Sequence, residues 1–335
     1  MYTKFFGFKS KPFEITPDPK FLFLSESHKE ALACLTYAVR ERKGFTVITG
    51  EVGTGKTTLV QSLLARLDGN TKTAYIFNPK LSSTDLLHSI CDDFGMKSPK
   101  RSKGQYISQL HKFLLDCYAR NENVVLIIDE AHTLDPKLLE EVRLLTNLET
   151  PKSKLLQVIL IGQPELNDIL EDPQFRQLKQ RVSLRYHVQP LSKEDTQKYI
   201  KRRLRIAGAF DHNVFTLKAF NKIYSYTKGL PRLINIVCDN ALLTGYATDQ
   251  KVIGYKVIRD VISNLEGVGF QKKQKRWKPF IAILIGAVIV SIIIILWKGV
   301  FSEMLGDLIK WKYTGQGFTE KVYEEVLKKI LKNTF

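Results

Sequence analysis

The chain has 335 residues, of which 44% are hydrophobic, an ordinary composition for a globular protein with a core and a smaller second domain. Its formal charge of +17 favours an acidic partner such as nucleic acid or an anionic membrane surface. Four scattered cysteines without a Cys-x-x-Cys pair, and only six histidines, argue against a disulfide framework and a metal cluster, and predict reduced thiols.

The first 43 residues are expected to form a preface that packs on the core. Turn-forming residues crowd positions 11–19, and the pattern of Ser27 to Glu30 predicts a capping box before a helix at 31–40. For most of the aromatic side chains in this preface we expect core packing, in preference to contact with a bound base; these are Phe5, Phe6, Phe8, Phe13, Phe21 and Phe23.

A phosphate-binding loop pattern follows in the run GEVGTGKT at residues 50–57, called the P-loop below. An apolar strand is predicted at 45–49 and a helix at 56–67, which disfavours a chance match. Loop N–H groups and the helix N-terminus would surround phosphate oxygens, with Lys56 on the β- and γ-phosphates and the Thr57 hydroxyl on Mg²⁺. The residues predicted to contact the nucleotide are Gly50, Glu51, Val52, Gly53, Thr54, Gly55, Lys56, Thr57 and Thr58.

Further along the chain, strand and helix patterns alternate as in a parallel α/β sheet. We predict a strand at 73–78, a helix from Ser82 or Ser83 to Phe94, and an amphipathic helix at 105–120.

An apolar strand at 124–128 ends in two acids, Asp129 and Glu130. Its unbroken apolar run predicts burial on both faces, and its carboxyl end is where open α/β sheets bind ligands. Asp129 is expected to hold Mg²⁺ through water, and Glu130 to orient the attacking water. An ordinary strand followed by a helix cap is the alternative, which the P-loop some 70 residues earlier disfavours.

Asp135 and Pro136 begin the next predicted helix, and a buried strand is expected at 155–161. Gln163 follows the tip of that strand. It either contacts the γ-phosphate and reports its presence or is a solvated loop residue, and the sequence leaves both interpretations open.

Residues 176–205 contain ten Lys and Arg against two acids, around a short strand at 185–188. An arginine that reaches the γ-phosphate of a neighbouring subunit can accelerate hydrolysis. Arg176 and Arg181 are the candidates, whereas most of these charges are expected to lie on a solvated face.

Four helices predicted at 193–207, 216–227, 231–246 and 254–265 indicate a small α-helical lid. Arg232 falls near the N-terminus of the third, where it could fold back onto bound phosphates.

Residues 280–297 contain no charged side chain and would span about 27 Å as a helix, close to the roughly 30 Å of a bilayer core. A buried core helix is the less favoured alternative. Basic residues concentrated before this segment, between 272 and 278, predict contact with anionic lipid headgroups and an ATP-binding part in the cytoplasm.

Several runs occur in a characteristic order: FFGFKSKPFEITPDPKFLFLSESHKEAL, GEVGTGKTTL, IIDEAH, ILIGQPEL, QLKQRVSLRYHVQPL and GLPRLIN. Over about residues 1–265 they resemble the ExeA/GspA family (general secretion pathway protein A) of AAA+ ATPases. The resemblance implies ATP and Mg²⁺ as cofactors and hydrolysis by Lys56, Thr57, Asp129 and Glu130. It places Gln163 at the sensor-1 position and Arg232 at the sensor-2 position.

The resemblance also implies a bacterial inner-membrane protein with one membrane helix, a homo-oligomer of ring-like form, and a partner membrane or periplasmic protein in secretin assembly. The tail at 298–335 is too short for the family's usual peptidoglycan-binding domain. The fold class expected is a P-loop NTPase (AAA+) α/β parallel sheet with an α-helical lid and a C-terminal transmembrane helix. Its segments are a preface (1–43), an ATPase core (44–190), a lid (191–266), a basic linker (267–279), a transmembrane helix (280–297) and an extracytoplasmic tail (298–335).

Two other functions compete with a membrane-anchored ATPase that drives an envelope process. One is a DNA-binding ATPase regulator of the transposition type, since the basic segment 176–205 could follow phosphates. The other is a nucleotide-gated membrane scaffold, against which the intact pair of Asp129 and Glu130 argues.

Overall fold

The computed structural model describes residues 1–14, 19–77, 81–96, 102–151, 153–209 and 213–267, with the isolated positions 324 and 328. The chain divides into two units, Met1–Gly269 and Phe270–Phe335. The helices and strands described below belong to the first unit.

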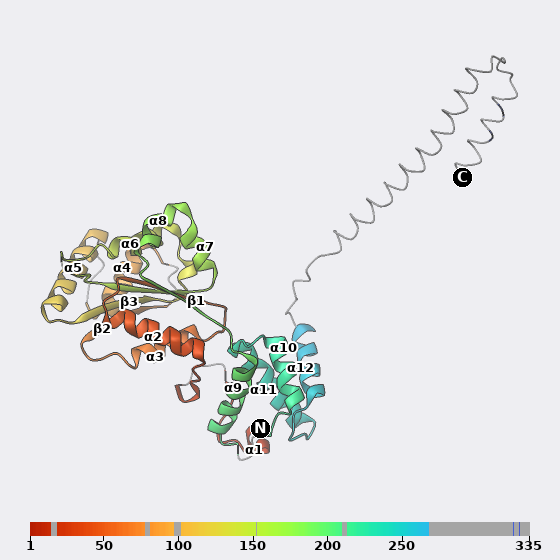
Figure 1. Ribbon diagram of the computed structural model, residues 1–335. Helices are drawn as coiled ribbons and strands as arrows, with labels where there is room; N and C mark the ends of the chain where they lie inside the picture. Colours follow the sequence, from red (N-terminus) through yellow and green to blue (C-terminus); the bar gives the residue numbers. More distant parts are fainter. Residues whose placement is uncertain are drawn as a thin grey trace. The chain divides into compact units, whose positions relative to one another are not determined.

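Five parallel strands form one sheet in the order β2-β3-β4-β1-β5 (Figure 1). Each predicted strand is present within two residues of its expected ends. Because parallel neighbours need a crossover, the intervening helices lie on the two faces of the sheet. The strands are β1 (Phe45–Gly50), β2 (Thr71–Ile76), β3 (Asn123–Ile128), β4 (Gln157–Gly162) and β5 (Leu184–Val188).

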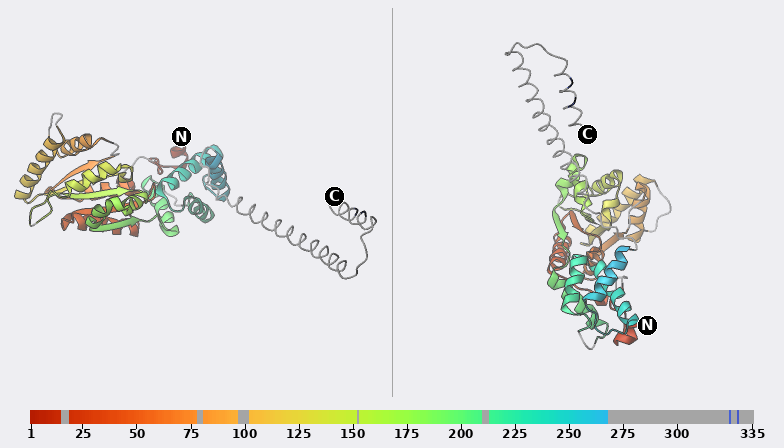
Figure 2. Two further views of the ribbon diagram at one scale, coloured as in Figure 1. Left: turned by 90° about the horizontal axis from the view of Figure 1, so that it is seen from above. Right: turned by 90° about the vertical axis from the view of Figure 1, so that its right-hand side faces the viewer.

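Helices cover both faces of the sheet, so its central strands are buried throughout (Figures 1 and 2). In β3, Leu126 packs toward one face and Val125 and Ile127 toward the other, as the two-residue period of a strand requires. One face is covered by α2 (Glu26–Arg40) and α3 (Lys56–Leu64). The other is covered by α4 (Ser83–Asp93), α5 (Lys103–Ala119), α6 (Pro136–Leu145), α7 (Glu165–Glu171) and α8 (Arg176–Arg181).

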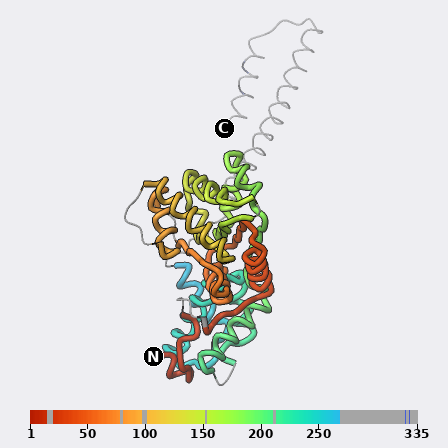
Figure 3. Tube along the Cα trace, turned by 90° about the vertical axis from the view of Figure 1, so that its left-hand side faces the viewer, coloured from red at the N-terminus to blue at the C-terminus, as the bar shows by residue number. Residues whose placement is uncertain are grey.

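A second hydrophobic cluster joins the C-terminal helices to the N-terminal segment. Tyr2, Phe8, Phe13 and Phe21 pack among these helices and not against the sheet, and Figure 3 shows the N-terminal segment running beside them. The helices are α9 (Lys193–Ile206), α10 (Leu217–Thr227), α11 (Pro231–Ala247) and α12 (Tyr255–Gly267), with the short α1 (Tyr2–Phe6). The four predicted C-terminal helices are thereby confirmed, and the segment boundaries stay a prediction.

The start of α2 differs from the capping box predicted at Ser27. The helix begins after Ser25, whose hydroxyl accepts the backbone N–H of His28 at 3.4 Å. Ser27 lies inside the helix, where its hydroxyl accepts the backbone N–H of Gln189 at 3.0 Å beyond β5. Either serine hydroxyl can cap a helix, but that of Ser27 is engaged by Gln189, and Ser25 is the cap.

The expected transmembrane helix must be corrected. Among the residues that the structure describes, no helix combines the length and the apolar character needed to cross a bilayer. The span predicted at 280–297, the lipid-binding stretch at 272–278 and nearly all of the tail lie outside the described residues. The part of the chain that the structure describes is therefore an α/β parallel sheet with C-terminal helices and without a membrane-spanning helix, and the single-pass inner-membrane localisation is withdrawn.

Candidate active site

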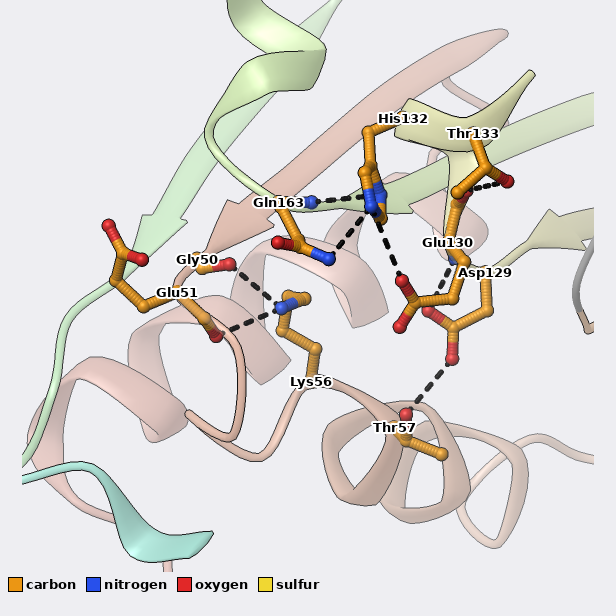
Figure 4. Close-up of polar contacts among 9 residues, drawn as sticks. All are labelled: Gly50, Glu51, Lys56, Thr57, Asp129, Glu130, His132, Thr133 and Gln163. Atoms are coloured by element: carbon orange, nitrogen blue, oxygen red, sulfur yellow. Dashed lines mark hydrogen bonds and ion pairs between the residues drawn. The ribbon is translucent and has the colours of Figure 1, made fainter. Parts of the chain in front are cut away.

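The candidate site lies at the carboxyl ends of three adjacent strands, β3, β4 and β1. In parallel strands these ends share one edge of the sheet, so segments distant in sequence meet there. The P-loop follows β1, Asp129 and Glu130 follow β3, and Gln163 follows β4. Figure 4 shows side chains from all three segments facing a common space.

The P-loop turns sharply through two glycines into the N-terminus of α3. Gly53 and Gly55 have φ angles of 80° and 98°, in the left-handed region that favours glycine. A Cβ atom at Gly53 would also come within 2.7 Å of the Arg232 side chain. This backbone leads into the open N-terminus of a helix, the usual protein site for phosphate.

Lys56 is buried at 7% exposure and folds back over the P-loop. Its ammonium group donates hydrogen bonds to the backbone oxygens of Gly50 at 2.8 Å and Glu51 at 3.0 Å. Burial lowers the pKa of Lys56, and the carboxylates of Glu130 and Asp129 oppose that shift. An ammonium has three N–H donors, so one remains for a phosphate oxygen beyond these two bonds.

Asp129 is fully buried and accepts hydrogen bonds from three groups. The Thr57 hydroxyl donates to it at 3.0 Å, the Tyr75 hydroxyl at 2.8 Å and the backbone N–H of Glu130 at 2.8 Å. Burial and the Asp129 charge raise the pKa of Tyr75, which keeps that hydroxyl a donor. The Thr57 and Asp129 oxygens fit Mg²⁺, which prefers oxygen ligands and takes few from protein when phosphates and water supply the rest.

Glu130 adopts a left-handed backbone conformation that is uncommon for a residue with a side chain. Its φ of 52° turns the chain sharply after β3 into the short 3₁₀ turn η2 (Ala131–Thr133). Thr133 fixes that turn by donating its backbone N–H and its hydroxyl to the Glu130 carbonyl oxygen. The Glu130 side chain is 35% exposed at the site, as a residue that orients water must be.

His132 connects Glu130 to Gln163, a link that the sequence interpretation missed. Its Nε2 lies 3.6 Å from a Glu130 carboxylate oxygen and 2.8 Å from the Gln163 side-chain amide (Figure 4). The Gln163 side chain is thereby held at the site, close to the P-loop. The only sequence signal for His132 was its place in the run IIDEAH, two residues after Glu130.

His28 supports the P-loop from behind and was also missed. It lies on α2, is 5% exposed, and its Nε2 is 2.8 Å from the carbonyl oxygen of Thr54. Ser25 contacts the other ring nitrogen at 2.6 Å. Because a carbonyl oxygen only accepts, the Nε2 carries the proton. Burial lowers the pKa of His28, which favours this neutral ring.

A cavity of about 390 Å³ extends from the P-loop to α9 and α11. Arg232 lies in its wall with its backbone N–H donating to the Gly53 carbonyl oxygen at 3.3 Å, near the predicted phosphate site. The wall also includes Phe21, Glu130, Gln163, Tyr199, Arg203 and Asn235.

Arg203 is a buried cation in the cavity wall, 6% exposed. Its guanidinium donates to the Tyr199 hydroxyl at 2.7 Å and to the Glu14 carbonyl oxygen at 3.2 Å, and lies 4.8 Å from the Phe21 ring centre. Tyr199 in turn donates to Asn235 at 2.8 Å. No local pattern separates Arg203 from the other basic residues of 176–205.

Arg176 and Arg181 lie outside the cavity wall of their own chain. Arg176 is exposed at the start of α8. Arg181 donates to the Thr146 hydroxyl at 2.6 Å, in its own subunit. Neither is placed to act on the site of its own subunit.

Known proteins share sequence and fold with this chain. Residues 39–170 match the family model described as an AAA domain. The chain is 43% identical over 293 residues to General secretion pathway protein A of Aeromonas hydrophila. The matched region covers 87% of this chain and 53% of that protein. The chain thus spans about half the length of this curated relative.

Solved structures show the same fold at low sequence identity. The ORC2 protein of Aeropyrum pernix has a TM-score of 0.58 at 16% identity, over 76% of this chain and 71% of that one. Cdc6p from Pyrobaculum aerophilum has a TM-score of 0.57 at 17% identity, over 74% and 71%. At such identities the likeness concerns the fold alone. With the match to the AAA domain model and the relative at 43% identity, the predicted resemblance is confirmed: the chain contains an AAA domain and is related to general secretion pathway protein A.

Proposed function

We propose that the chain binds Mg–ATP at the carboxyl edge of its sheet and hydrolyses it there. The observation that carries this proposal is the meeting of Lys56, the Thr57–Asp129 pair, Glu130 and Gln163 at one point, from three separate strands. Each supplies a group that phosphoryl transfer to water needs, and none is explained by packing.

The P-loop N–H groups and Lys56 hold the β- and γ-phosphates, which places the γ-phosphorus for in-line attack. Thr57 and Asp129 would hold Mg²⁺, which would supply positive charge to neutralise the phosphate oxygens. Glu130 accepts a hydrogen bond from the attacking water and orients it, while Gln163 donates to the γ-phosphate. Arg232 contacts the phosphates from α11, so bound nucleotide tightens the contact between α11 and the P-loop.

Self-association supplies a further arginine in this account. Arg176 is the better candidate, because it is exposed whereas Arg181 is bonded to Thr146 of its own chain. An arginine from a neighbour stabilises the charge of the transition state and makes hydrolysis depend on assembly.

The relationship to general secretion pathway protein A supports a role in secretion. We infer that the nucleotide cycle drives a step of that pathway through a partner protein. Helices α9 to α12 would bind this partner, and their position would follow the nucleotide state of the P-loop. This role extends beyond hydrolysis and needs its own test.

Phosphate release from Mg–ATP by the full chain, measured over a range of protein concentrations, tests the central proposal. The rate per subunit should rise with concentration and then level off as assemblies form. A rate independent of concentration throughout the assembly range would contradict the contribution in trans, and absence of any hydrolysis would contradict the proposed function.

A further inference from the structure

His132 lies between the two side chains that would face the γ-phosphate and the attacking water. It is 14% exposed, and its Nε2 is 2.8 Å from the Gln163 side-chain amide and 3.6 Å from a Glu130 carboxylate oxygen. Its Nδ1 lies 3.4 Å from the backbone nitrogen of Gln163, whose N–H it can accept when the ring proton is on Nε2. The ring therefore contacts Gln163 twice and Glu130 once.

A neutral imidazole has one N–H and one acceptor nitrogen, so its two sides cannot both accept. If the Gln163 amide turns its NH₂ group to the ring, as it does in this structure, Nε2 must accept and the proton lies on Nδ1. If the amide turns its oxygen to the ring, Nε2 must carry the proton, and Nδ1 is then free to accept the backbone N–H. Only the second arrangement presents an N–H toward Glu130.

The γ-phosphate selects between these arrangements, because its oxygens only accept hydrogen bonds. A Gln163 amide that donates its NH₂ group to a phosphate oxygen must turn its carbonyl oxygen toward His132. The ring proton is then fixed on Nε2, beside the Glu130 carboxylate. This N–H donates to the Gln163 oxygen, and the nitrogen that carries it lies 3.6 Å from one Glu130 oxygen. At that distance the N–H attracts the carboxylate without a second hydrogen bond, and the other Glu130 oxygen is left to orient water.

We propose that His132 is a positioning residue that couples the γ-phosphate contact of Gln163 to the orientation of Glu130. The inference rests on the proposed function, since it takes Gln163 to face the γ-phosphate and Glu130 to orient water. It adds that hydrolysis requires a donor at the Nε2 position, and that the tautomer of this ring differs between ATP and ADP.

Kinetics of matched variants test the donor requirement in the full chain. The side-chain amide of Gln lies near the Nε2 position of His, and that of Asn lies near Nδ1. His132→Ala and His132→Asn should lower kcat by about 10- to 100-fold with KM for ATP within roughly twofold, since misplacing a catalytic group affects mainly the transition state. His132→Gln should retain most of the wild-type kcat. Combining His132→Ala with Gln163→Ala should cost little beyond the slower single variant, because both interrupt the same link.

Nitrogen NMR of the imidazole tests the tautomer directly, with His132→Gln identifying the signal among the six histidines. A non-hydrolysable ATP analogue with Mg²⁺ should give the Nε2–H form, and ADP should give a different tautomer population. The same tautomer population with both nucleotides, or equal kcat in the Asn and Gln variants, would overturn the coupling. If wild type hydrolyses ATP and the His132 variants do so equally well, only this inference fails; if wild type does not hydrolyse ATP, the proposed function fails and this inference with it.

Discussion

Thr57 and Asp129 stand 72 positions apart in the chain, yet the threonine hydroxyl donates to the buried carboxylate at 3.0 Å. The two residues come from the first turn of α3 and the end of β3. Because β4 separates β3 from β1 in the sheet, only the full parallel order brings them together. This pair is the proposed Mg²⁺ site.

Thr57→Val keeps the shape of the side chain and removes the hydroxyl. Hydrolysis should fall by about 100-fold or more, because metal contacts in phosphoryl transfer contribute several kcal/mol to transition-state stabilisation. Thr57→Ser retains the hydroxyl and should stay within a few-fold of wild type. The measurement is the Mg²⁺ dependence of phosphate release, and equal Mg²⁺ dependence in the Val and Ser variants would remove Thr57 from the site.

Lys56→Met preserves the bulk of a buried side chain but leaves the Gly50 and Glu51 carbonyl oxygens without their donor. Nucleotide affinity should fall at least about tenfold, because hydrogen bonds to charged groups contribute roughly 1.5–3 kcal/mol. Titration with a fluorescent ATP analogue measures this. Lys29→Met, on the exposed face of α2, is the matched control and should bind as wild type does.

His28 should make stability depend on pH. Burial lowers its pKa in the folded state, so below the ordinary pKa of about 6.5 the unfolded chain binds more protons than the folded one. The contribution of neutral His28 to stability is therefore present above pH 6.5 and is lost as pH falls toward its folded pKa. Urea unfolding at pH 7 and pH 5 measures the loss.

His28→Gln should show a smaller loss of stability between those two pH values than wild type. His111 is exposed on α5, so His111→Gln should leave the pH dependence unchanged. An unfolding free energy that falls equally in all three proteins would contradict the assignment to His28.

Arg176→Ala should lower kcat by roughly 10³-fold with nucleotide affinity intact, if this arginine acts in a neighbouring subunit. Arg181→Ala should instead destabilise the fold by about 1 kcal/mol, through the lost bond to Thr146, and retain hydrolysis. Mixing the Arg176→Ala and Glu130→Gln variants tests action in trans. The first variant supplies an intact Glu130 and the second supplies the arginine, so the hydrolysis rate of the mixture should exceed the rates of both variants alone. A rate equal to the average of the two would exclude action in trans.

The strands, most helices and the P-loop could be predicted because each carries a local signal. The unbroken apolar run of β3 indicates burial on both faces, and glycines at fixed spacing indicate a phosphate loop. The short helices α7 and α8 were not predicted, since seven and six residues show too little periodicity.

The supporting residues of the site could not be predicted, because their roles depend on contacts across the fold. His28 and Thr54 are 26 positions apart, Tyr75 and Asp129 are 54 apart, and nothing in either local sequence marks the partner. Arg203 differs from its basic neighbours only in its burial, which follows from its contacts with Pro12, Glu14 and Phe21. Local patterns therefore identify the residues that are predicted to act on the nucleotide, whereas the residues that support them become apparent only from tertiary contacts.

Glu130→Gln provides the most direct test of the central claim, that this site hydrolyses ATP with Glu130 orienting the water. The amide keeps the size of the side chain but is a far weaker acceptor for a water proton. Binding of Mg–ATP, measured by calorimetry, should stay within about twofold of wild type, while kcat should fall by about 10²- to 10⁴-fold. Full hydrolysis by the Gln variant would contradict the account, since another group would then orient the water.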